Sequence, residues 1–527
     1  MARSIRLISS ALTVGAWTLM SRVLGFVRDV LIAAWLGTGP VAEAFLIAFA
    51  LPNMFRRFFA EGAFNMAFIP LFSKKLESGD NPEGFARDAM SGLAAVLIVF
   101  TVFAIIFMPW LVLAMASGFA GDERFDMTVT LGRIVFPYIL FISLAALLSG
   151  VLNASGRFVA AAAAPVLLNI ILIAALVLGS FLAPNFTVID AAAAGSEYGT
   201  LLAFGVILAG IAQMSLVWLA VHRAGYDLRP KRPVWTPELK RLAIIAAPAA
   251  LAGGVVQVNL LIGRQVASFF DGAVAWLSYA DRLYQLPLGV VGIAIGIVLL
   301  PDLSRRLQAE DTDGGQHALS RAAEMSMALS IPAAVALVII PTPLVEALFQ
   351  RGAFGADDTA ATALACAVYG LGLPAFILQK VVQPLYFARE DTRRPFYFAL
   401  VALVVNAAVA IGLAPLIGFI AAAIATTLAG WAMLALLWTG TRSMGQAARF
   451  DGRAKKRIWL IVFASALMGL ALWVGQFLIA PLMEMPGYKV LGILLLCVFG
   501  ALVYAAAGLS IGAFRRDELR AVFRRQR

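Results

Sequence analysis

Apolar stretches of about 20 residues or more recur along the whole chain, and this feature constrains its fold most. A helix of about 20 apolar residues is long enough to cross the hydrocarbon core of a bilayer. With 62% hydrophobic and 13% charged residues among 527, the chain has far less polar surface than a soluble protein of its size requires. The sequence therefore predicts an all-α polytopic membrane protein.

Counting these stretches gives about 14 predicted transmembrane helices. They lie at residues 8–36, 41–72, 87–115, 126–151, 158–183, 198–222, 238–267, 273–301, 319–349, 359–387, 395–415, 418–441, 456–482 and 488–514. The basic start MARSIR precedes a long apolar run without a small-residue cleavage site. The first stretch is therefore expected to remain as an anchor.

Lysine and arginine residues predict the orientation. If the N-terminus is cytoplasmic, 30 basic residues fall in inner loops and tails, and 3 fall in outer loops: Arg124, Arg351 and Lys489. Inner loops of membrane proteins are normally richer in these residues. We therefore expect both termini to be cytoplasmic. The net charge of +11 reflects this distribution and gives no sign of a nucleic-acid surface.

Segments about 230 residues apart resemble each other. IPLFSKKLE (69–77) resembles LPDLSRRLQ (300–308). The basic turn LNASGRF (152–158) has a counterpart in FAREDTRRPF (387–396), and each turn is followed by a helix with an asparagine, Asn169 or Asn406. We interpret this as an internal repeat; chance similarity between Leu- and Ala-rich helices is the alternative.

The repeat predicts two parallel six-helix lobes, at residues 1–222 and 238–441. Residues 223–237 are then a cytoplasmic linker between the lobes. Residues 442–527 lie outside the repeat and contain two extra helices followed by a basic cytoplasmic tail.

Basic residues inside the predicted spans need an explanation, because each costs about 2.5–3.5 kcal/mol at a helix centre. They are Arg22, Arg28, Arg56, Arg57, Arg133, Arg264, Arg282 and Lys380. The acidic residues near them are Asp29, Glu43, Glu61 and Asp281. Two of the basic residues, Arg133 and Arg264, lie near outer helix ends, where a long side chain can reach the membrane surface.

Four arginines are candidates for a binding site. Arg22 and Arg56 lie near the middle of the first two spans, whereas Arg28 and Arg282 come from different lobes and lie at similar depth. Positive charge exceeds negative charge here, and guanidinium groups suit phosphate or carboxylate. We expect a positive central cavity that holds an anionic substrate; buried ion pairs that lock the lobes together are the alternative.

The remaining features of these spans are assigned less fully. Arg57 and Glu61 are spaced to pair along one helix face, and the roles of Asp29, Arg57 and Lys380 stay open. Gly25, between two of the arginines, predicts a bend in the first helix. The two cysteines and two histidines predict neither a disulfide framework nor a metal site.

Several motifs together resemble one known family. They are SRVLGFVRD (21–29), AEAFLIAFALPNMFRRFFAEGAF (42–64), LNASGRF (152–158), YADRLYQLPLGVVGIAIG (279–296) and LFQRGAF (348–354). This combination is similar to the bacterial lipid II flippases of the MurJ (MviN) family, within the multidrug/oligosaccharidyl-lipid/polysaccharide exporter superfamily. The resemblance extends over residues 1–441.

The resemblance implies alternating access and transport of lipid II, the undecaprenyl-diphosphate-linked peptidoglycan precursor, from the inner to the outer leaflet of the bacterial cytoplasmic membrane. The implied partners are this lipid, membrane lipids and cell-wall synthesis proteins. Its last two helices imply a groove for the lipid tail. The substrate-binding positions of the family match Arg22, Arg28, Arg56, Arg282, Glu43, Glu61 and Asp281.

Three positions depart from the family pattern. Glu43 stands where aspartate is common, Ala50 where some members carry lysine, and Gln285 where an acid often follows the arginine. Some members bind sodium, but the corresponding helices here offer amides and a hydroxyl without an obvious carboxylate: Gln257, Asn259, Asn406 and Thr426. No cofactor is expected, and sodium, a proton gradient and the membrane potential stay open as the energy source.

Other functional classes fit less well. A flippase of another polyprenyl-diphosphate-linked glycan stays open. A multidrug exporter of the same superfamily would need an acidic cavity for cationic drugs. A membrane glycosyltransferase would need catalytic carboxylates in a loop, and only GDERFD (121–126) is an acid-rich outer loop. We therefore expect neither an enzyme nor a scaffold without transport activity.

Overall fold

The computed structural model describes residues 2–57, 63–182, 191–485 and 487–514. These residues form helices joined by short turns and contain no strand, which confirms the predicted all-α class. The chain divides into two compact units. Unit 1 comprises Met1–Ala275 with Arg351–Phe354, and unit 2 comprises Trp276–Gln350 with Gly355–Arg527.

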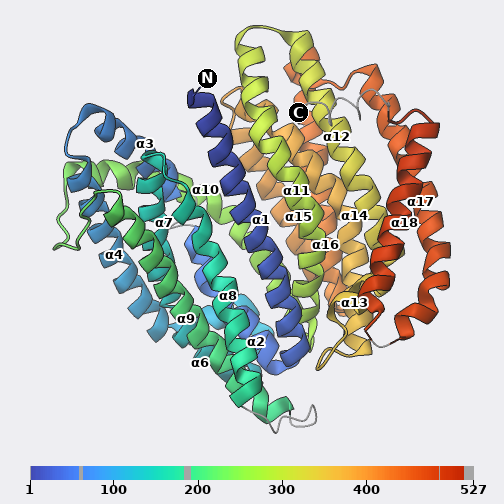
Figure 1. The fold of residues 1–527 in the computed structure, drawn as a ribbon, viewed down its shortest axis with the longest axis horizontal. Helices are drawn as coiled ribbons and strands as arrows, with labels where there is room; N and C mark the ends of the chain where they lie inside the picture. The colour runs from blue at the N-terminus through green and yellow to red at the C-terminus, as the bar shows by residue number, and fades with distance from the viewer. Residues whose placement is uncertain (1, 58–62, 183–190, 486, 515–527) are drawn as a thin grey trace. The chain divides into compact units, whose positions relative to one another are not determined.

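Unit 1 contains the first ten α-helices, whose course Figure 1 shows. They are α1 (Ala2–Leu36), α2 (Pro40–Arg56), α3 (Ala63–Ser78), α4 (Pro82–Ile106), α5 (Met108–Ala116), α6 (Glu123–Val135), α7 (Tyr138–Ala154), α8 (Val159–Leu182), α9 (Ala191–Arg223) and α10 (Pro237–Ala267), with the 3₁₀ turn η2 (Ser117–Phe119) after α5. Helix α10 packs with α3 of this unit, whereas the predicted lobe boundary precedes it. The division into two six-helix lobes at residues 1–222 and 238–441 therefore stays a prediction.

Unit 2 contains the remaining helices, apart from the first turn of α11. They are α11 (Ala273–Gln308), α12 (Thr312–Ile339), α13 (Pro341–Phe349), α14 (Ala356–Phe387), α15 (Arg393–Ile417), α16 (Ile420–Gly440), α17 (Gly452–Glu484) and α18 (Lys489–Ser510), with the 3₁₀ turns η4 (Thr441–Met444) and η5 (Gln446–Ala448) between α16 and α17.

Ten described segments are long and apolar enough to cross a membrane. They are Pro82–Ile106, Glu123–Ala154, Val159–Phe181, Glu197–Arg223, Thr312–Ile339, Ala356–Phe387, Arg393–Ile417, Ile420–Met444, Gln446–Glu484 and Lys489–Ser510. The other four predicted spans coincide with α1, with α2 and α3, with α10 and with α11. The chain is therefore a multi-pass membrane protein, and its total of 14 spans stays a prediction.

Two predicted spans are each divided into a long and a short helix. The helix that starts the third predicted span ends at Ile106, and a nine-residue helix, α5, follows after Phe107. In unit 2, α12 ends at Ile339, and another nine-residue helix, α13, follows after Ile340. Both short helices have a proline in their first two positions, where its missing N–H costs no helical hydrogen bond. A short helix with a proline in its first turn therefore ends one predicted span in each unit. The fourth predicted span is also made of two helices, α6 and α7, with Pro137 between them.

The turns after α3 and α11 also match. In each, a basic side chain pairs with an acid five residues later: Lys75 Nζ with Asp80 at 2.8 Å, and Arg306 Nη1 with Asp311 at 3.2 Å. A side-chain oxygen then caps the next helix: Asn81 Oδ1 accepts from the Gly84 N–H, and Asp311 Oδ1 accepts from the Gly314 N–H. These are the two segments whose sequences resemble each other, so the predicted repeat is accompanied by matching local structure.

The core of unit 1 gathers around the second half of α1 and the first half of α2. Ile32 and Leu36 of α1 and Phe45 of α2 are at most 8% exposed. They belong to one cluster with Tyr138 of α7 and Leu172 of α8. Apolar burial therefore fixes the C-terminal half of α1, which is the half that carries Arg28.

The predicted inter-lobe linker is fastened to α4. Arg87 donates to the Asp227 carbonyl at 2.6 Å, and the Lys231 backbone N–H donates to Ser91 Oγ at 3.1 Å. The Lys231 ammonium also pairs with Asp88. The linker is thus a structural part of unit 1 at this end.

The two extra helices are fastened to α12 and α13. Met468 and Leu472 of α17 and Leu496 of α18 pack with Ile340 and Ala347 in a cluster whose members are at most 6% exposed. Predominantly apolar packing therefore joins α17 and α18 to unit 2.

Charged side chains reinforce this attachment near the start of α17. Glu324 of α12, 5% exposed, pairs with Arg321 at 2.6 Å and with Arg457 of α17 at 3.0 Å. A groove for a lipid tail in this region stays a prediction.

Candidate functional site

Arg28 lies in a buried polar cluster on α1. It is 6% exposed and its neighbour Asp29 is 7% exposed. Asp29 Oδ1 accepts hydrogen bonds from Arg28 Nε at 3.0 Å and from Nη2 at 2.7 Å. Residues that are adjacent in a helix normally point to different faces, but here the long arginine side chain turns back to its neighbour. Asp29 is therefore a direct partner of Arg28.

The third partner of this cluster comes from α8. Asn169 Oδ1 accepts from Arg28 Nη1 at 3.0 Å, and Asn169 Nδ2 donates to the Ser21 carbonyl at 2.9 Å. A Cβ at Gly25 would lie 3.5 Å from the same amide. Helix α1 runs unbroken through Gly25, so the predicted bend is not an interruption of the helix.

The other predicted residues of unit 1 have different surroundings. The Arg22 side chain is exposed, and that of Arg56 is partly buried. Arg57 Nη1 donates to Gln257 of α10 at 3.5 Å, a long hydrogen bond. Its predicted partner Glu61 lies outside the described residues, so that pair is untested.

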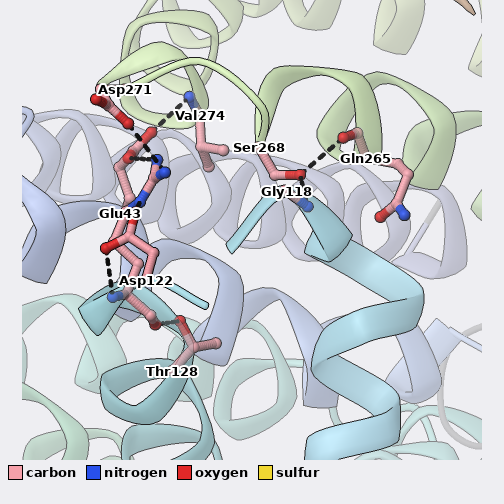
Figure 2. A network of polar contacts seen from close by, with 9 residues as sticks. Glu43, Gly118, Asp122, Thr128, Gln265, Ser268, Asp271 and Val274 are labelled. Carbon is pink, nitrogen blue, oxygen red and sulfur yellow. Dashed lines mark hydrogen bonds and ion pairs between the residues drawn. The ribbon is translucent and has the colours of Figure 1, made fainter. Parts of the chain in front are cut away.

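Glu43 is held in a network of protein contacts near the start of α2. It is 1% exposed. Its Oε2 accepts from Arg124 Nη1 at 2.9 Å, and its Oε1 accepts from the Val274 N–H at the start of α11, also at 2.9 Å. Figure 2 shows Glu43 beside Val274 and Asp271. Both carboxylate oxygens are thus engaged by protein donors, and a direct role of Glu43 in substrate binding stays a prediction.

Arg124 is the centre of this network. Besides Glu43, it contacts Asp122 through Nε at 2.5 Å and Asp271 through Nη2 at 2.9 Å. Asp122 also accepts from the Arg124 backbone N–H and caps α6 (Figure 2). Burial raises the pKa of the Asp122 carboxyl, but the hydrogen bonds from Arg124 outweigh it and lower that pKa overall. Of the acids in segment 121–126, Asp122 therefore has a structural role as a partner of Arg124 and as the cap of α6.

A second polar contact in the same unit joins α5 and η2 to α10. Ser268 Oγ accepts from the Gly118 N–H at 3.0 Å and donates to the Gln265 carbonyl at 2.7 Å (Figure 2). The Gln265 side-chain oxygen Oε1 also accepts from the Ser117 N–H at 3.1 Å. A Cβ at Gly118 would come within 2.4 Å of the Ser268 backbone. This close approach therefore requires glycine at position 118.

The predicted site residues of unit 2 lie near the start of α11. Arg282 is exposed and Asp281 is partly buried. Gln285, one turn later, donates through Nε2 to Asp281 Oδ2. The amide that departs from the family pattern therefore binds the neighbouring acid, where an acid would repel it.

The structure gives no sign of a metal centre in the part of the chain that it describes. No group of three or more His, Cys, Asp or Glu side chains is arranged there to hold an ion. Of the residues considered for sodium, Gln257 accepts from Arg57, and Thr426 Oγ1 donates to the Ala422 carbonyl. A coupling ion stays a question for experiment.

Sequence reasoning missed two residues, Asn169 as a partner of Arg28 and Arg124 as a partner of Glu43. A signal existed for each of them. An amide in an apolar span is costly without a hydrogen-bond partner, and a carboxylate such as Glu43 inside a span needs a cation. Neither signal identifies the partner, which lies 141 residues away for Arg28 and 81 for Glu43.

Comparison with known families decides what kind of protein this is. The family model described as "Lipid II flippase MurJ" matches residues 32–499. The chain belongs to the MurJ family. This confirms the resemblance of the sequence motifs and extends it beyond residue 441, into the two extra helices.

Individual MurJ relatives align over nearly the whole chain. A probable lipid II flippase MurJ of Rhizobium meliloti (strain 1021) is 42% identical over 523 residues, which cover 97% of this chain and 96% of the relative. The lipid II flippase MurJ of Burkholderia cenocepacia is 37% identical over 474 residues and covers 89% and 90% of the two chains.

Solved structures share the fold. A lipid II flippase MurJ in an inward closed conformation matches with a TM-score of 0.75 and 24% identity over 94% of this chain and 98% of its own. A multidrug resistance transporter of the MATE family matches with a TM-score of 0.61 and 13% identity over 86% and 98%. At these identities the likeness concerns the fold alone, and it is greater for the MurJ structure.

Proposed function

We propose that this chain moves lipid II from the cytoplasmic to the outer leaflet of the bacterial cytoplasmic membrane. The observation that carries the proposal is the match of the lipid II flippase family over most of the chain. Relatives named as lipid II flippases cover almost its full length and support the same activity. Both termini would be cytoplasmic, as the distribution of basic residues indicates.

The arginines give the chain a means of recognising the diphosphate. We propose that Arg22, Arg28, Arg56 and Arg282 bind its oxygens. Guanidinium groups can form two parallel hydrogen bonds to such an anion. The side chains of Arg22 and Arg282 are exposed and can therefore be reached by a ligand. Glu61 and Asp281 stay predicted members of the site, as does Glu43.

Transport of this kind changes no covalent bond in the lipid, so the proposal includes no catalytic residue and no resident cofactor. Alternating access would expose the site to each leaflet in turn. Sodium, protons and the membrane potential remain candidates for the driving force. Cell-wall synthesis proteins that use lipid II at the outer face are the proposed partners.

The experiment uses the purified full chain in lipid vesicles. Three cargoes are compared: fluorescent lipid II, a fluorescent undecaprenyl-diphosphate-linked glycan without the peptide, and a cationic dye. Movement is measured with a probe that reacts only at the outer face. We expect lipid II to cross faster than either other cargo. If the glycan or the dye crossed as fast as lipid II or faster, the assignment of lipid II as the preferred cargo would be wrong.

Matched arginine variants connect this activity to the site. Arg282→Ala is expected to lower the rate of lipid II movement at least about tenfold, since a hydrogen bond to a charged group is lost. Arg133→Ala is the control, because Arg133 is an exposed arginine whose Nε donates to the Ile105 carbonyl on the neighbouring helix. Equal rates of lipid II movement in the two variants would show that Arg282 does not bind the substrate.

A further inference from the structure

Asn169 of α8 is a residue that the sequence motifs did not assign to the site. We propose that Asn169 is a positioning residue, which holds the Arg28 guanidinium in the orientation that meets the diphosphate. The inference rests on the proposed function, because it assumes that Arg28 binds an anionic headgroup.

Two hydrogen bonds define the position of Asn169. Its amide oxygen accepts from Arg28 Nη1 at 3.0 Å, and its amide nitrogen donates to the Ser21 carbonyl at 2.9 Å. Arginine can only donate and a carbonyl can only accept, so one orientation of the amide satisfies both partners. One side chain thus links the guanidinium to the backbone of α1 about two helical turns earlier.

The hydrogen bond between Asn169 and Arg28 is energetically important because both side chains are buried. Asn169 is 5% exposed and Arg28 is 6% exposed. A buried amide without partners is costly, and hydrogen bonds to charged groups are stronger than those between neutral groups. Asn169 is therefore accommodated in an apolar helix through its contacts with α1.

The charge of the cluster favours an amide at this position. Asp29 already balances the positive charge of Arg28 at 2.7 Å. Asn169 adds a hydrogen-bond acceptor without a second negative charge, whereas a carboxylate there would repel a diphosphate.

Arg28 keeps N–H donors for a ligand while Asp29 and Asn169 hold its guanidinium. Of its five N–H groups, the contacts with Asp29 and Asn169 use one on each nitrogen. Within the part of the chain that the structure describes, one N–H therefore remains on each of the two terminal nitrogens. This arrangement orients the guanidinium and leaves it able to bind.

The test measures binding of two lipids to the purified full chain in nanodiscs. Undecaprenyl diphosphate carries the headgroup, and undecaprenol has the same chain without it. We expect Asn169→Leu to lower the affinity for undecaprenyl diphosphate about 10- to 100-fold, the range for losing a hydrogen bond to a charged group. The affinity for undecaprenol should stay within about twofold, since no headgroup contact is involved.

A double-variant comparison separates positioning from general stability. In an Arg28→Lys background, Asn169→Leu should lower the affinity by no more than about twofold, because the two residues act through one interaction. Gln213→Leu is the matched control. Gln213 is also a buried amide of unit 1, 1% exposed. Its amide oxygen accepts a hydrogen bond from the Tyr138 hydroxyl at 3.1 Å, and its amide nitrogen donates to the Ala164 carbonyl at 3.0 Å. It should destabilise the chain and leave the preference for the diphosphate unchanged.

Each other outcome has a defined meaning. Wild-type affinity in Asn169→Leu, or equal losses for both lipids, overturns the positioning role. If the wild type itself does not prefer undecaprenyl diphosphate to undecaprenol, the proposed function fails first. Should Asn169→Leu not fold, Asn169→Asp replaces it. This variant keeps the shape and the acceptor but adds a negative charge, and unchanged diphosphate affinity in it also overturns the proposal.

Discussion

At the residue scale, Arg28 has two roles that can be separated. It is proposed to bind the diphosphate, and it is the cation that balances the buried Asp29. Removal of one member of a buried ion pair typically costs about 3–5 kcal/mol, whereas removal of both costs much less. Arg28→Ala should therefore lower the free energy of unfolding by about this amount, and Arg28→Ala/Asp29→Ala should recover most of it. Neither variant should move lipid II.

Thermal unfolding of the purified variants measures the first part, and the vesicle assay measures the second. Arg22→Ala serves as the control, because its exposed side chain should affect transport with little change in stability. An unfolding midpoint of Arg28→Ala equal to that of the wild type would show that the pair does not support the fold.

The residues that carry charge inside the spans could be predicted from the sequence, but their partners could not. Arg28 stood out because an arginine is rare in an apolar span. Its contact with Asn169 depends on how α8 packs against α1, which no local pattern records. Arg124 gave the weaker signal, since an arginine in a predicted outer loop needs no explanation, and only its contact with the buried Glu43 reveals its role.

At the element scale, Arg124 joins the start of α6 to the start of α2 and to the segment before α11. Arg124→Met leaves Glu43 and its neighbouring carboxylates without their shared cation. We expect a loss of about 3–5 kcal/mol in the free energy of unfolding. Arg133→Met on the same helix should change it by no more than about 0.5 kcal/mol, because that side chain is exposed. Similar unfolding midpoints for the two variants would contradict the structural importance of the network.

The attachment of α17 and α18 gives another prediction for an element. Glu324→Gln removes the acid that Arg321 and Arg457 share, so the start of α17 should open more often. Hydrogen exchange measured by mass spectrometry should then be at least about threefold faster in this region, the change expected for a loss of somewhat more than RT. Glu484→Gln, at the exposed far end of α17, should leave it unchanged. Unchanged exchange in Glu324→Gln would show that apolar packing alone holds the helix.

Element positions followed closely from apolar length, whereas the breaks within elements did not. The third and ninth predicted spans each proved to be two helices, because prolines near Phe107 and Ile340 start a new helix inside an apolar run. Both sides of such a break are apolar, so hydrophobicity gives no signal of it. The linker was predicted as a connector, and its bonds to α4 became visible only in the structure.

At the scale of the whole molecule, composition and the charge distribution were sufficient to predict a polytopic α-helical protein. The sequence motifs led to the family, and the family led to the cargo. Physical reasoning alone reached an anionic substrate but could not distinguish one polyprenyl-diphosphate lipid from another, because a guanidinium recognises phosphate regardless of the attached glycan.

The most direct measurement of the central claim is depletion of this protein in its native bacterium, followed by quantification of lipid II in each leaflet of the cytoplasmic membrane. Without the flippase, newly made lipid II cannot cross the bilayer. The account predicts that lipid II accumulates in the inner leaflet and falls in the outer leaflet before growth stops. An unchanged distribution between the leaflets after depletion would contradict it.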